Sequence, residues 1–377
     1  MFHIILQRLG GDKVIWTIVF LLALFSVLAV YSSTGTIAYK LKDGNTEWYV
    51  IKHIGLLAAG LALMYLCYLT PYIRYNQMSP VLLVMAVPLL IFTLMYGVEL
   101  NDARRWVTVP VINLTFQSSD FAKLALIIYV ARSISAKQEY IKDFNSAFLP
   151  IIVPVIIICT LIAPSDLSTA ILLLLTCLLL MFMGRVAMKY IFLLIIGGVF
   201  AFSFLLMIGR AAPDIVRVKT WENRMQNFIG EGDGKDYFQV EQAKIAISEG
   251  GLFGVGPGNS TTRNRLPHPY SDYIYAIIIE EYGLLGGGVV ILLYLMLFFR
   301  CVRLVTKSPK AFGAMVALGL SLSLVLQAFM NMAVVVNLVP VTGLTLPLVS
   351  MGGTSLLFTC VSIGIILSVS RYIERVT

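Results

Sequence analysis

Ten long apolar segments follow one another along this chain of 377 residues, and they restrict its fold more than any other feature. A helix that crosses a bilayer needs roughly 20 consecutive apolar residues, and lipid offers no other hydrogen-bond partner to the backbone of an open chain. Only 13% of the residues are charged, whereas soluble domains carry about a quarter. The sequence therefore predicts an all-α polytopic membrane protein that forms a single domain over residues 1–377.

The fourth predicted span is the shortest of the ten, and it carries Lys123 close to its start. The ten predicted cores are Val14–Tyr31, Ile54–Leu69, Pro80–Tyr96, Phe121–Ile134, Ala147–Ala163, Ser168–Gly184, Ala187–Ile208, Tyr273–Phe299, Phe312–Leu338 and Thr354–Ser370.

Lys and Arg residues are distributed unevenly between the two sides of the membrane. Fourteen lie in the connections on the side of the N-terminus, and five lie in the short loops on the other side. Because basic residues favour cytoplasmic loops, both termini are predicted to be cytoplasmic. The long polar loop over residues 210–272, between the seventh and eighth spans, is then extracytoplasmic. The net charge of +8 fits anchoring beside anionic lipid, and nucleic-acid binding is not needed to explain it.

Cysteine and histidine provide no evidence of a metal site or a disulfide framework. The five cysteines all lie within or at the end of apolar runs, where a buried thiol acts as a small hydrophobic side chain. The three histidines form no ligand pattern such as HExxH.

An outward-facing motif carries cations on the side that disfavours them. It consists of Arg104, Arg105 and Trp106, followed by Lys123 at the mouth of the fourth span. Arginine forks suit phosphate oxygens, and an ionisable residue at a helix mouth is often functional. Trp106 is equally typical of an interfacial anchor. The motif indicates an anionic partner, with interfacial anchoring as the alternative.

The long loop ends in a glycine-rich stretch and a single aspartate. Residues 250–260 lack the GxxxxGK[ST] pattern of a phosphate-binding loop, so a tight turn is the favoured interpretation. Asp272 stands at the start of the eighth span, where a carboxylate serves either as a helix N-cap or as a reactive group. Glu280 and Glu281 lie deeper, and we expect them to pair internally or to line a polar cavity.

The order of these motifs resembles the SEDS family (shape, elongation, division and sporulation), the polytopic polymerases of bacterial peptidoglycan. The resemblance covers nearly the whole chain. It is carried by the segments Asn101–Trp106, Gln117–Lys123, Asp166–Ala170, Ala246–Gly251, Leu266–Tyr275 with Glu280–Gly283, Asn331–Met332 with Pro340–Pro347, and Ser350–Ser355.

Three positions depart from the pattern that the family usually shows. Gln-Pro-Ser-Glu becomes Gln117–Asp120, which keeps an acid and loses the proline. Asp-Leu-Gly becomes Asp166–Ser168, and His268 replaces the glutamate of Leu-Pro-Glu. Asp272 and Lys123 are both retained.

The resemblance implies a substrate and a reaction. SEDS proteins join lipid II units, in which a disaccharide-peptide is attached to undecaprenyl pyrophosphate. The implied general base is Asp272, and the implied pyrophosphate ligands are Arg104, Arg105 and Lys123. Other implied substrate-binding residues are Trp106, Arg263, Arg265 and Ser355. A divalent cation, Mg²⁺ or Mn²⁺, is compatible with the pyrophosphate but is not required by any cluster in the sequence.

The resemblance also implies a biological setting. The Gly256–Ser260 stretch is closer to the FtsW division branch than to the RodA elongation branch. Either branch implies a class B penicillin-binding protein as partner, and the division branch adds other division-complex membrane proteins and a septal location. A lipid II flippase and a purely structural recruitment role are the alternatives. A transporter is expected to show deep charges, broken helices and repeats, and we find no clear repeat.

The predicted topology is tested with single cysteines at Ala136 and Gly234 in a variant that lacks the five native cysteines. We expect an impermeant maleimide to label position 234 in intact spheroplasts and position 136 only after the membrane is permeabilised. Labelling of position 136 from outside would contradict the orientation.

Overall fold

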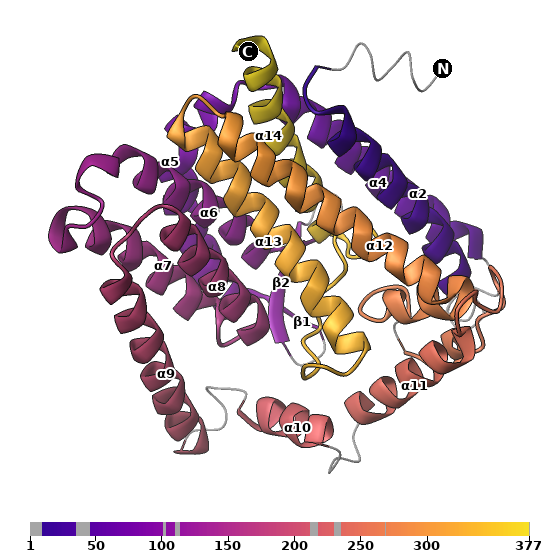
Figure 1. Ribbon diagram of the computed structural model, residues 1–377. Coiled ribbons are helices and arrows are strands. Elements are labelled where there is room, and N and C mark those ends of the chain that lie inside the picture. Colours follow the sequence, from indigo (N-terminus) through magenta and orange to yellow (C-terminus); the bar gives the residue numbers. More distant parts are fainter. Residues whose placement is uncertain are drawn as a thin grey trace. The chain divides into compact units, whose positions relative to one another are not determined.

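A computed structural model describes residues 10–34, 46–100, 103–109, 114–211, 218–229, 235–267 and 269–376. Each of the ten predicted spans coincides for most of its length with a helix (Figure 1). The side chain of Arg104 and the whole of His268 lie outside the described part. The helices that contain the spans are α2 (Lys13–Ser33), α4 (Thr46–Leu69), α5 (Tyr72–Tyr96), α6 (Ser118–Ala136), α7 (Leu149–Ile162), α8 (Leu167–Met183), α9 (Met188–Ala211), α12 (Ile274–Lys307), α13 (Ala311–Val335) and α14 (Thr354–Val376).

Seven helical segments of the described residues are long and apolar enough to cross a membrane. They are α2, α4, α5, a π-helical turn with α7 (Phe144–Ile162), α12, α13 and α14. Two shorter apolar helices are α8 and the first part of α9, Met188–Gly198. Helix α6 is not in either group, and it carries Asp120, Lys123 and Arg132. The helical polytopic fold is thus confirmed, while the count of ten spans stays a prediction.

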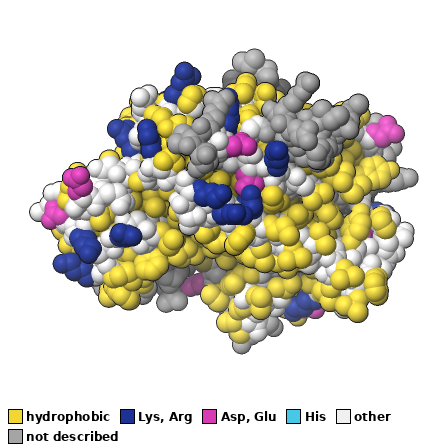
Figure 2. All heavy atoms as spheres, turned by 45° about the horizontal axis from the view of Figure 1, so that its top comes forward, with side chains coloured by type: hydrophobic (Ala, Val, Ile, Leu, Met, Phe, Trp, Pro, Cys, Tyr) yellow, Lys and Arg dark blue, Asp and Glu magenta, His cyan; other side chains and the backbone are white. Residues whose placement is uncertain are grey.

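Exposed hydrophobic side chains cover broad areas of the face shown in Figure 2. The same property appears on α5, where Val81, Val84 and Met85 are 61%, 70% and 56% exposed. Side chains of this kind are stable against lipid and unfavourable against water, so the exposed apolar surface supports a membrane-embedded protein.

The chain divides into two compact units, which are described one at a time. The first unit comprises Met1–Cys67, Asn223–Arg300 and Leu324–Gly364, and the second comprises Tyr68–Glu222, Cys301–Ser323 and Ile365–Thr377. The single domain expected over residues 1–377 stays a prediction.

Helix α6 forms the packed centre of the second unit, where it contacts α5, α7 and α8. Its small residues Ala122, Ala125 and Ala131 are at most 1% exposed, which lets neighbouring helices approach closely. Helix–helix contacts surround α6, so its charged residues reach protein groups rather than lipid.

A small sheet in the second unit fills the loop between α5 and α6, where the sequence predicted no strands. Strands β1 (Val98–Leu100), β2 (Ala103–Val109) and β3 (Leu114–Gln117) pair antiparallel in the order β1-β2-β3. Trp106 stands opposite Val98 on one side and Gln117 on the other. The sheet therefore pairs Trp106 with Gln117, the residue that precedes α6.

The long loop between α9 and α12 also contains helices. These are α10 (Val218–Ile229), α11 (Lys235–Gly250) and a single 3₁₀ turn, Thr262–Asn264.

Helix α12 is interrupted at Gly283, whose φ of 70° and ψ of −176° are not helical. In an unbroken helix the amides of residues 284 and 285 would donate to the carbonyls of Glu280 and Glu281. Instead, the amide of Leu284 donates to Gly251 O (2.9 Å), and the amide of Leu285 donates to Leu252 O (3.3 Å). The break thus frees two carbonyls and redirects two amides.

The glycine-rich stretch supplies the missing partners. The carbonyl of Glu280 accepts from the amide of Val255 (2.9 Å), and the carbonyl of Glu281 accepts from that of Gly256 (3.0 Å). We call residues 250–256 with residues 280–285 the backbone interlock. The predicted turn in this stretch is confirmed, and its amides at 255 and 256 serve α12 rather than an anion.

The interlock requires glycine where two backbones touch. A Cβ added at Gly254 would overlap the Glu281 carbonyl, and one added at Gly283 would overlap the Leu252 carbonyl. Both glycines also have a positive φ. The composition of this stretch is therefore explained by close backbone approach.

Gly254→Ala and Gly258→Ala form a matched pair that tests the interlock. The φ angles are 82° and 79°, but a Cβ at Gly258 meets nothing within 4 Å. Both changes incur about 1–2 kcal/mol of left-handed strain, and only the first adds an overpacking cost of about 1–3 kcal/mol. We expect a clearly lower thermal midpoint for Gly254→Ala, measured on detergent-solubilised protein by size-exclusion after heating. Equal midpoints would contradict a stabilising interlock.

Candidate functional site

Asp272 is half-buried in the first unit, at the point where the long loop enters α12. The hydroxyl of Ser271 donates to its Oδ1 at 2.8 Å. The helix begins at Ile274, and the carbonyl of Tyr273 already accepts from the amides of Ala276 (3.0 Å) and Ile277 (3.4 Å). Tyr273 therefore occupies the N-cap position, and Asp272 stands one residue before it.

The surroundings of Asp272 combine aromatic side chains with tight backbone. Burial raises the pKa of Tyr270, and the neighbouring Tyr49 and Asp272 raise this pKa further, so the phenol beside the carboxylate stays neutral. The backbone at Gly343, with φ of 70°, passes close by, because a Cβ there would lie 3.9 Å from Asp272 Oδ2. Asp272 thus stands half-buried between an aromatic side chain and the backbone of another segment.

The carboxylate of Glu280 holds the loop against α12. Glu280 is 0% exposed. It accepts from the hydroxyl of Ser260 (2.5 Å) and from the amides of Thr261 (2.8 Å) and Thr262 (3.1 Å). The 3₁₀ turn at Thr262–Asn264 thus begins on a buried acid. The internal pairing expected for Glu280 is confirmed.

Glu281 is paired internally as well. Its Oε1 accepts from the hydroxyl of Ser32, in the last turn of α2, and its Oε2 is buried with no hydrogen-bond partner among the described residues. Arg263 reaches the same serine, and its guanidinium donates to the carbonyl (3.0 Å) and the hydroxyl (3.2 Å) of Ser32. A cation at the last carbonyls of a helix is favourable for the helix dipole.

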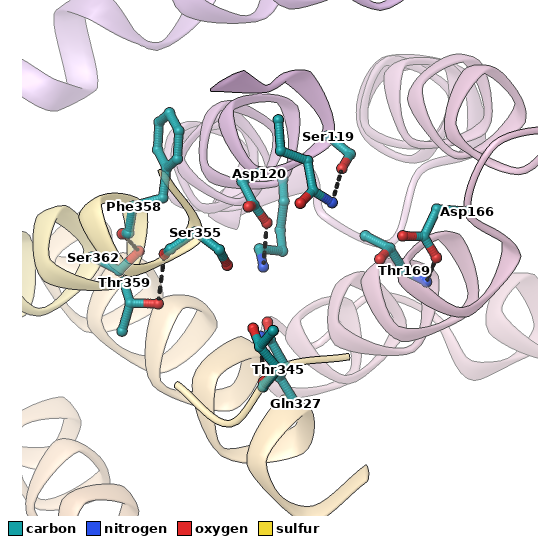
Figure 3. Close-up of polar contacts among 12 residues, drawn as sticks. Ser119, Asp120, Asp166, Thr169, Gln327, Thr345, Ser355, Phe358, Thr359 and Ser362 are labelled. Atoms are coloured by element: carbon teal, nitrogen blue, oxygen red, sulfur yellow. Dashed lines mark hydrogen bonds and ion pairs between the residues drawn. The ribbon is translucent and has the colours of Figure 1, made fainter. Parts of the chain in front are cut away.

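In the second unit, Lys123 forms an ion pair with Asp120 at the start of α6. The Lys123 Nζ lies 3.2 Å from Asp120 Oδ1, and the side chains are 13% and 5% exposed. Figure 3 shows Asp120 at the start of α6. Asp120 Oδ2 is buried with no hydrogen-bond partner in the described part of the chain. Lys123 therefore has an acidic partner at the start of α6. The sequence showed an excess of cations in this region and did not suggest this pairing.

Arg105 is also paired within the second unit. Its Nε donates to the carbonyl of Ser165 at 2.7 Å, and its guanidinium lies 3.2 Å from Asp166 Oδ2. The other oxygen of Asp166 accepts from the amide of Thr169 at 3.1 Å and caps α8 (Figure 3). One acid thus joins a helix start to the strand that carries Arg105 and Trp106.

The model of the FtsW/RodA/SpoVE family, described as a cell cycle protein, matches residues 12–375. The chain belongs to the SEDS family. Stage V sporulation protein E of Bacillus subtilis strain 168 is 32% identical, over 97% of this chain and 98% of the relative. A protein of Geobacter metallireducens named probable peptidoglycan glycosyltransferase FtsW is 33% identical, over 95% and 94%.

Solved structures show the same fold. A structure described as a peptidoglycan synthase complex that coordinates polymerisation and crosslinking matches with a TM-score of 0.73 and 23% identity, over 96% of this chain and 98% of that one. RodA of Thermus thermophilus matches with a TM-score of 0.68 and 22% identity, over 97% and 98%. The resemblance drawn from the sequence is thus confirmed at the level of the SEDS family and its fold.

The remaining predicted ligands of this SEDS protein lie apart in the chain. Arg265 is exposed just after the 3₁₀ turn, and its amide donates to Thr262 O at 3.0 Å. Ser355 opens α14 with 9% exposure, and its carbonyl accepts from the hydroxyl of Thr359 (Figure 3). Substrate binding by these two residues stays a prediction.

Two polar residues near Asp272 were quoted in the SEDS motifs but were assigned no role from the sequence. The side-chain amide of Asn331, in α13, donates to the backbone carbonyl of Asp272 at 2.8 Å. The hydroxyl of Ser350 donates to the backbone carbonyl of Ser271 at 2.7 Å. A polar amide inside an apolar span is a signal that points to such a contact. Its partner lies 59 positions away in the sequence and can be identified only from the tertiary structure.

Among the described residues, no three His, Cys, Asp or Glu side chains gather into a metal-binding group. The divalent cation stays a prediction.

Proposed function

We propose that this chain is a peptidoglycan glycosyltransferase that polymerises lipid II at the outer face of the cytoplasmic membrane. Membership of the SEDS family supports this, as do relatives that are named probable peptidoglycan glycosyltransferase FtsW. The observation that carries the proposal is a half-buried carboxylate, Asp272, held at the entrance of α12 beside a neutral tyrosine.

The proposed reaction is an inverting sugar transfer. The GlcNAc 4-hydroxyl of one lipid II attacks C1 of the MurNAc at the end of the growing chain, and the bond from C1 to the undecaprenyl pyrophosphate breaks. Asp272 takes the proton of the attacking hydroxyl and later gives it to water. The pyrophosphate leaves with the bonding electron pair, so fixed positive charge must stabilise it.

We assign that charge to Lys123, Arg105 and Arg104. Lys123 and Arg105 are each paired with an acid of their own unit, which keeps them ordered in the absence of substrate. An arginine carries five N–H donors. The contacts of Arg105 to Ser165 and Asp166 involve its Nε–H and one of its two NH₂ groups. Trp106, Arg263, Arg265 and Ser355 remain proposed substrate contacts, although the guanidinium of Arg263 lies on Ser32.

The proposed partner is a crosslinking enzyme, a class B penicillin-binding protein, together with other membrane proteins of the division complex. The similarity to a synthase complex that coordinates polymerisation and crosslinking supports the first. We propose a septal, FtsW-like role with both termini cytoplasmic. RodA-like elongation is the alternative. The Gly256–Ser260 stretch suggested the division branch, but its last residue also has a structural role, because the hydroxyl of Ser260 donates to the buried carboxylate of Glu280.

One observation favours the flippase alternative: α12 is broken, and broken helices are typical of transporters. In transporters, however, the freed backbone groups coordinate the substrate or ion. Here the glycine-rich loop satisfies them. A lipid II translocation assay in proteoliposomes distinguishes the two, because translocation without polymerisation would favour the flippase.

Asp272→Asn is expected to insert, fold and bind its partner normally, and to make no glycan polymer. Asparagine keeps the size and the local hydrogen bonding of aspartate but cannot accept the proton. Loss of a general base typically lowers the rate by about 10²–10⁴-fold. Polymerisation of purified lipid II, followed on gels with the full-length chain and its partner, measures this. Near-normal polymer from the variant would assign catalysis to another group.

Lys123→Met is expected to lower lipid II turnover at least tenfold. A charged hydrogen-bond partner contributes about 1.5–3 kcal/mol, and about 1.4 kcal/mol corresponds to a factor of ten. The change also leaves Asp120 buried without its lysine, so Lys123→Met combined with Asp120→Asn is the control. Normal turnover by the double variant would show that Lys123 only neutralises Asp120.

A further inference from the structure

Three consecutive backbone carbonyls just before α12 are each held by a separate donor of the first unit. Tyr270 O accepts from the amide of Met351 at 3.0 Å, and Ser271 O accepts from the hydroxyl of Ser350 at 2.7 Å. Asp272 O accepts from the amide nitrogen of Asn331 at 2.8 Å. The segment that carries the carboxylate is thus fixed along its whole length.

The side chain of Asn331 joins this segment to a second one. Its amide nitrogen also donates to Leu344 O at 2.7 Å, so both N–H groups point at carbonyls. Asn331 is 1% exposed, and its Oδ1 is buried with no hydrogen-bond partner among the described residues. A carboxylate or an alkyl group has no N–H to donate to the two carbonyls.

The second segment, residues 336–353 between α13 and α14, is itself held in a strained shape. Leu348 has a φ of 63°, which is unusual for a bulky residue. The carbonyls on either side of it accept from other helices: Tyr294 donates to Pro347 O, and Ser26 donates to Val349 O at 2.8 Å. Strain of this kind persists only where surrounding contacts over-determine the backbone.

Ser350 connects this rigid segment to the base. Its hydroxyl donates to Ser271 O and accepts from the amide of Leu346 at 2.8 Å, so one oxygen serves both segments. At 2% exposure it has no access to solvent that would replace a lost bond.

We propose that Asn331 and Ser350 are positioning residues that hold the Asp272 carboxylate in its catalytic orientation. The inference rests on the proposed role of Asp272 as general base. Both residues act through the backbone: Asn331 donates to the main-chain carbonyl of Asp272, and Ser350 donates to that of Ser271. A misplacement of about 1 Å lowers the rate of an enzymatic step by roughly 10²-fold, so loss of either donor lowers kcat more than it changes substrate binding.

The same helix offers a matched control. Gln327 stands one turn before Asn331 in α13, is 4% exposed, and donates to Thr345 O at 3.0 Å. It therefore ties α13 to the same 336–353 segment, through the carbonyl of Thr345. Asn331→Leu and Gln327→Leu both remove a buried amide; the first releases the Asp272 carbonyl, and the second releases the Thr345 carbonyl.

The experiment compares Asn331→Leu, Ser350→Ala, Ser350→Thr, Gln327→Leu and Asp272→Asn as full-length proteins with their partner. Each is assayed for kcat and KM with lipid II, per folded molecule as quantified by size-exclusion, together with its thermal midpoint. We expect Asn331→Leu and Ser350→Ala to lower kcat by about tenfold or more with KM within about twofold. Ser350→Thr, which keeps the hydroxyl, and Gln327→Leu should retain kcat within about twofold.

Two outcomes overturn the inference. The first is a wild-type kcat in both Asn331→Leu and Ser350→Ala while Asp272→Asn is inactive, which leaves the base assignment intact. The second is an equal loss of kcat in Gln327→Leu, which shows general loosening of the segment. Normal polymerisation by Asp272→Asn overturns the proposed base itself, and with it the need for positioning. If Asn331→Leu does not fold, Ser350→Ala, which removes a single oxygen, decides the question.

Discussion

Backbone hydrogen bonding is the constraint on which the rest of this structure depends. In lipid, an amide or carbonyl without a partner costs several kcal/mol, so a non-helical backbone survives only where protein groups satisfy it. Two non-helical stretches of the first unit are the break of α12 at Gly283 and the segment 336–353. In both places, other groups of the chain provide hydrogen-bond partners for the backbone. The glycine-rich loop supplies backbone bonds to the first, and hydroxyl and amide side chains supply bonds to the second.

Buried charged side chains likewise take their partners from within the protein. Glu280 is stabilised by hydroxyls and amides, while Lys123 and Arg105 are each stabilised by an acid of their own unit. Breaking a buried pair by removing one partner is more costly than the pair is worth. For this reason, a single substitution at Lys123 mixes catalysis with stability, and the Asp120 control is needed to separate them.

The proposed catalytic carboxylate benefits from both features. Asp272 lies at the end of a long loop, and its segment is bonded to α13 through Asn331 and to the 336–353 segment through Ser350. The interlock fixes α12 itself. A base that must meet a sugar hydroxyl at hydrogen-bond distance needs such support, because general-base catalysis depends on geometry first and on pKa second.

The sequence alone determined the class of fold, because apolar length and charge scarcity are properties of the chain that lipid selects directly. It also determined the family, since ordered motifs from Asn101 to Ser355 survive single departures such as His268. It indicated Asp272, and it predicted that the two glutamates either pair internally or line a polar cavity. These inferences need only residue type and position along the chain, and none of them names a bonding partner.

Only the tertiary structure decided which partners the polar residues take. Asn331 and Asp272 are 59 positions apart, and Arg263 and Ser32 are 231 apart. No periodicity or spacing encodes such pairs. The same holds for the glycine-rich stretch, whose composition fits a surface turn and whose actual task is to complete a broken helix. Hydrogen bonds are short and directional, so their partners are fixed only when the packing of the helices is fixed.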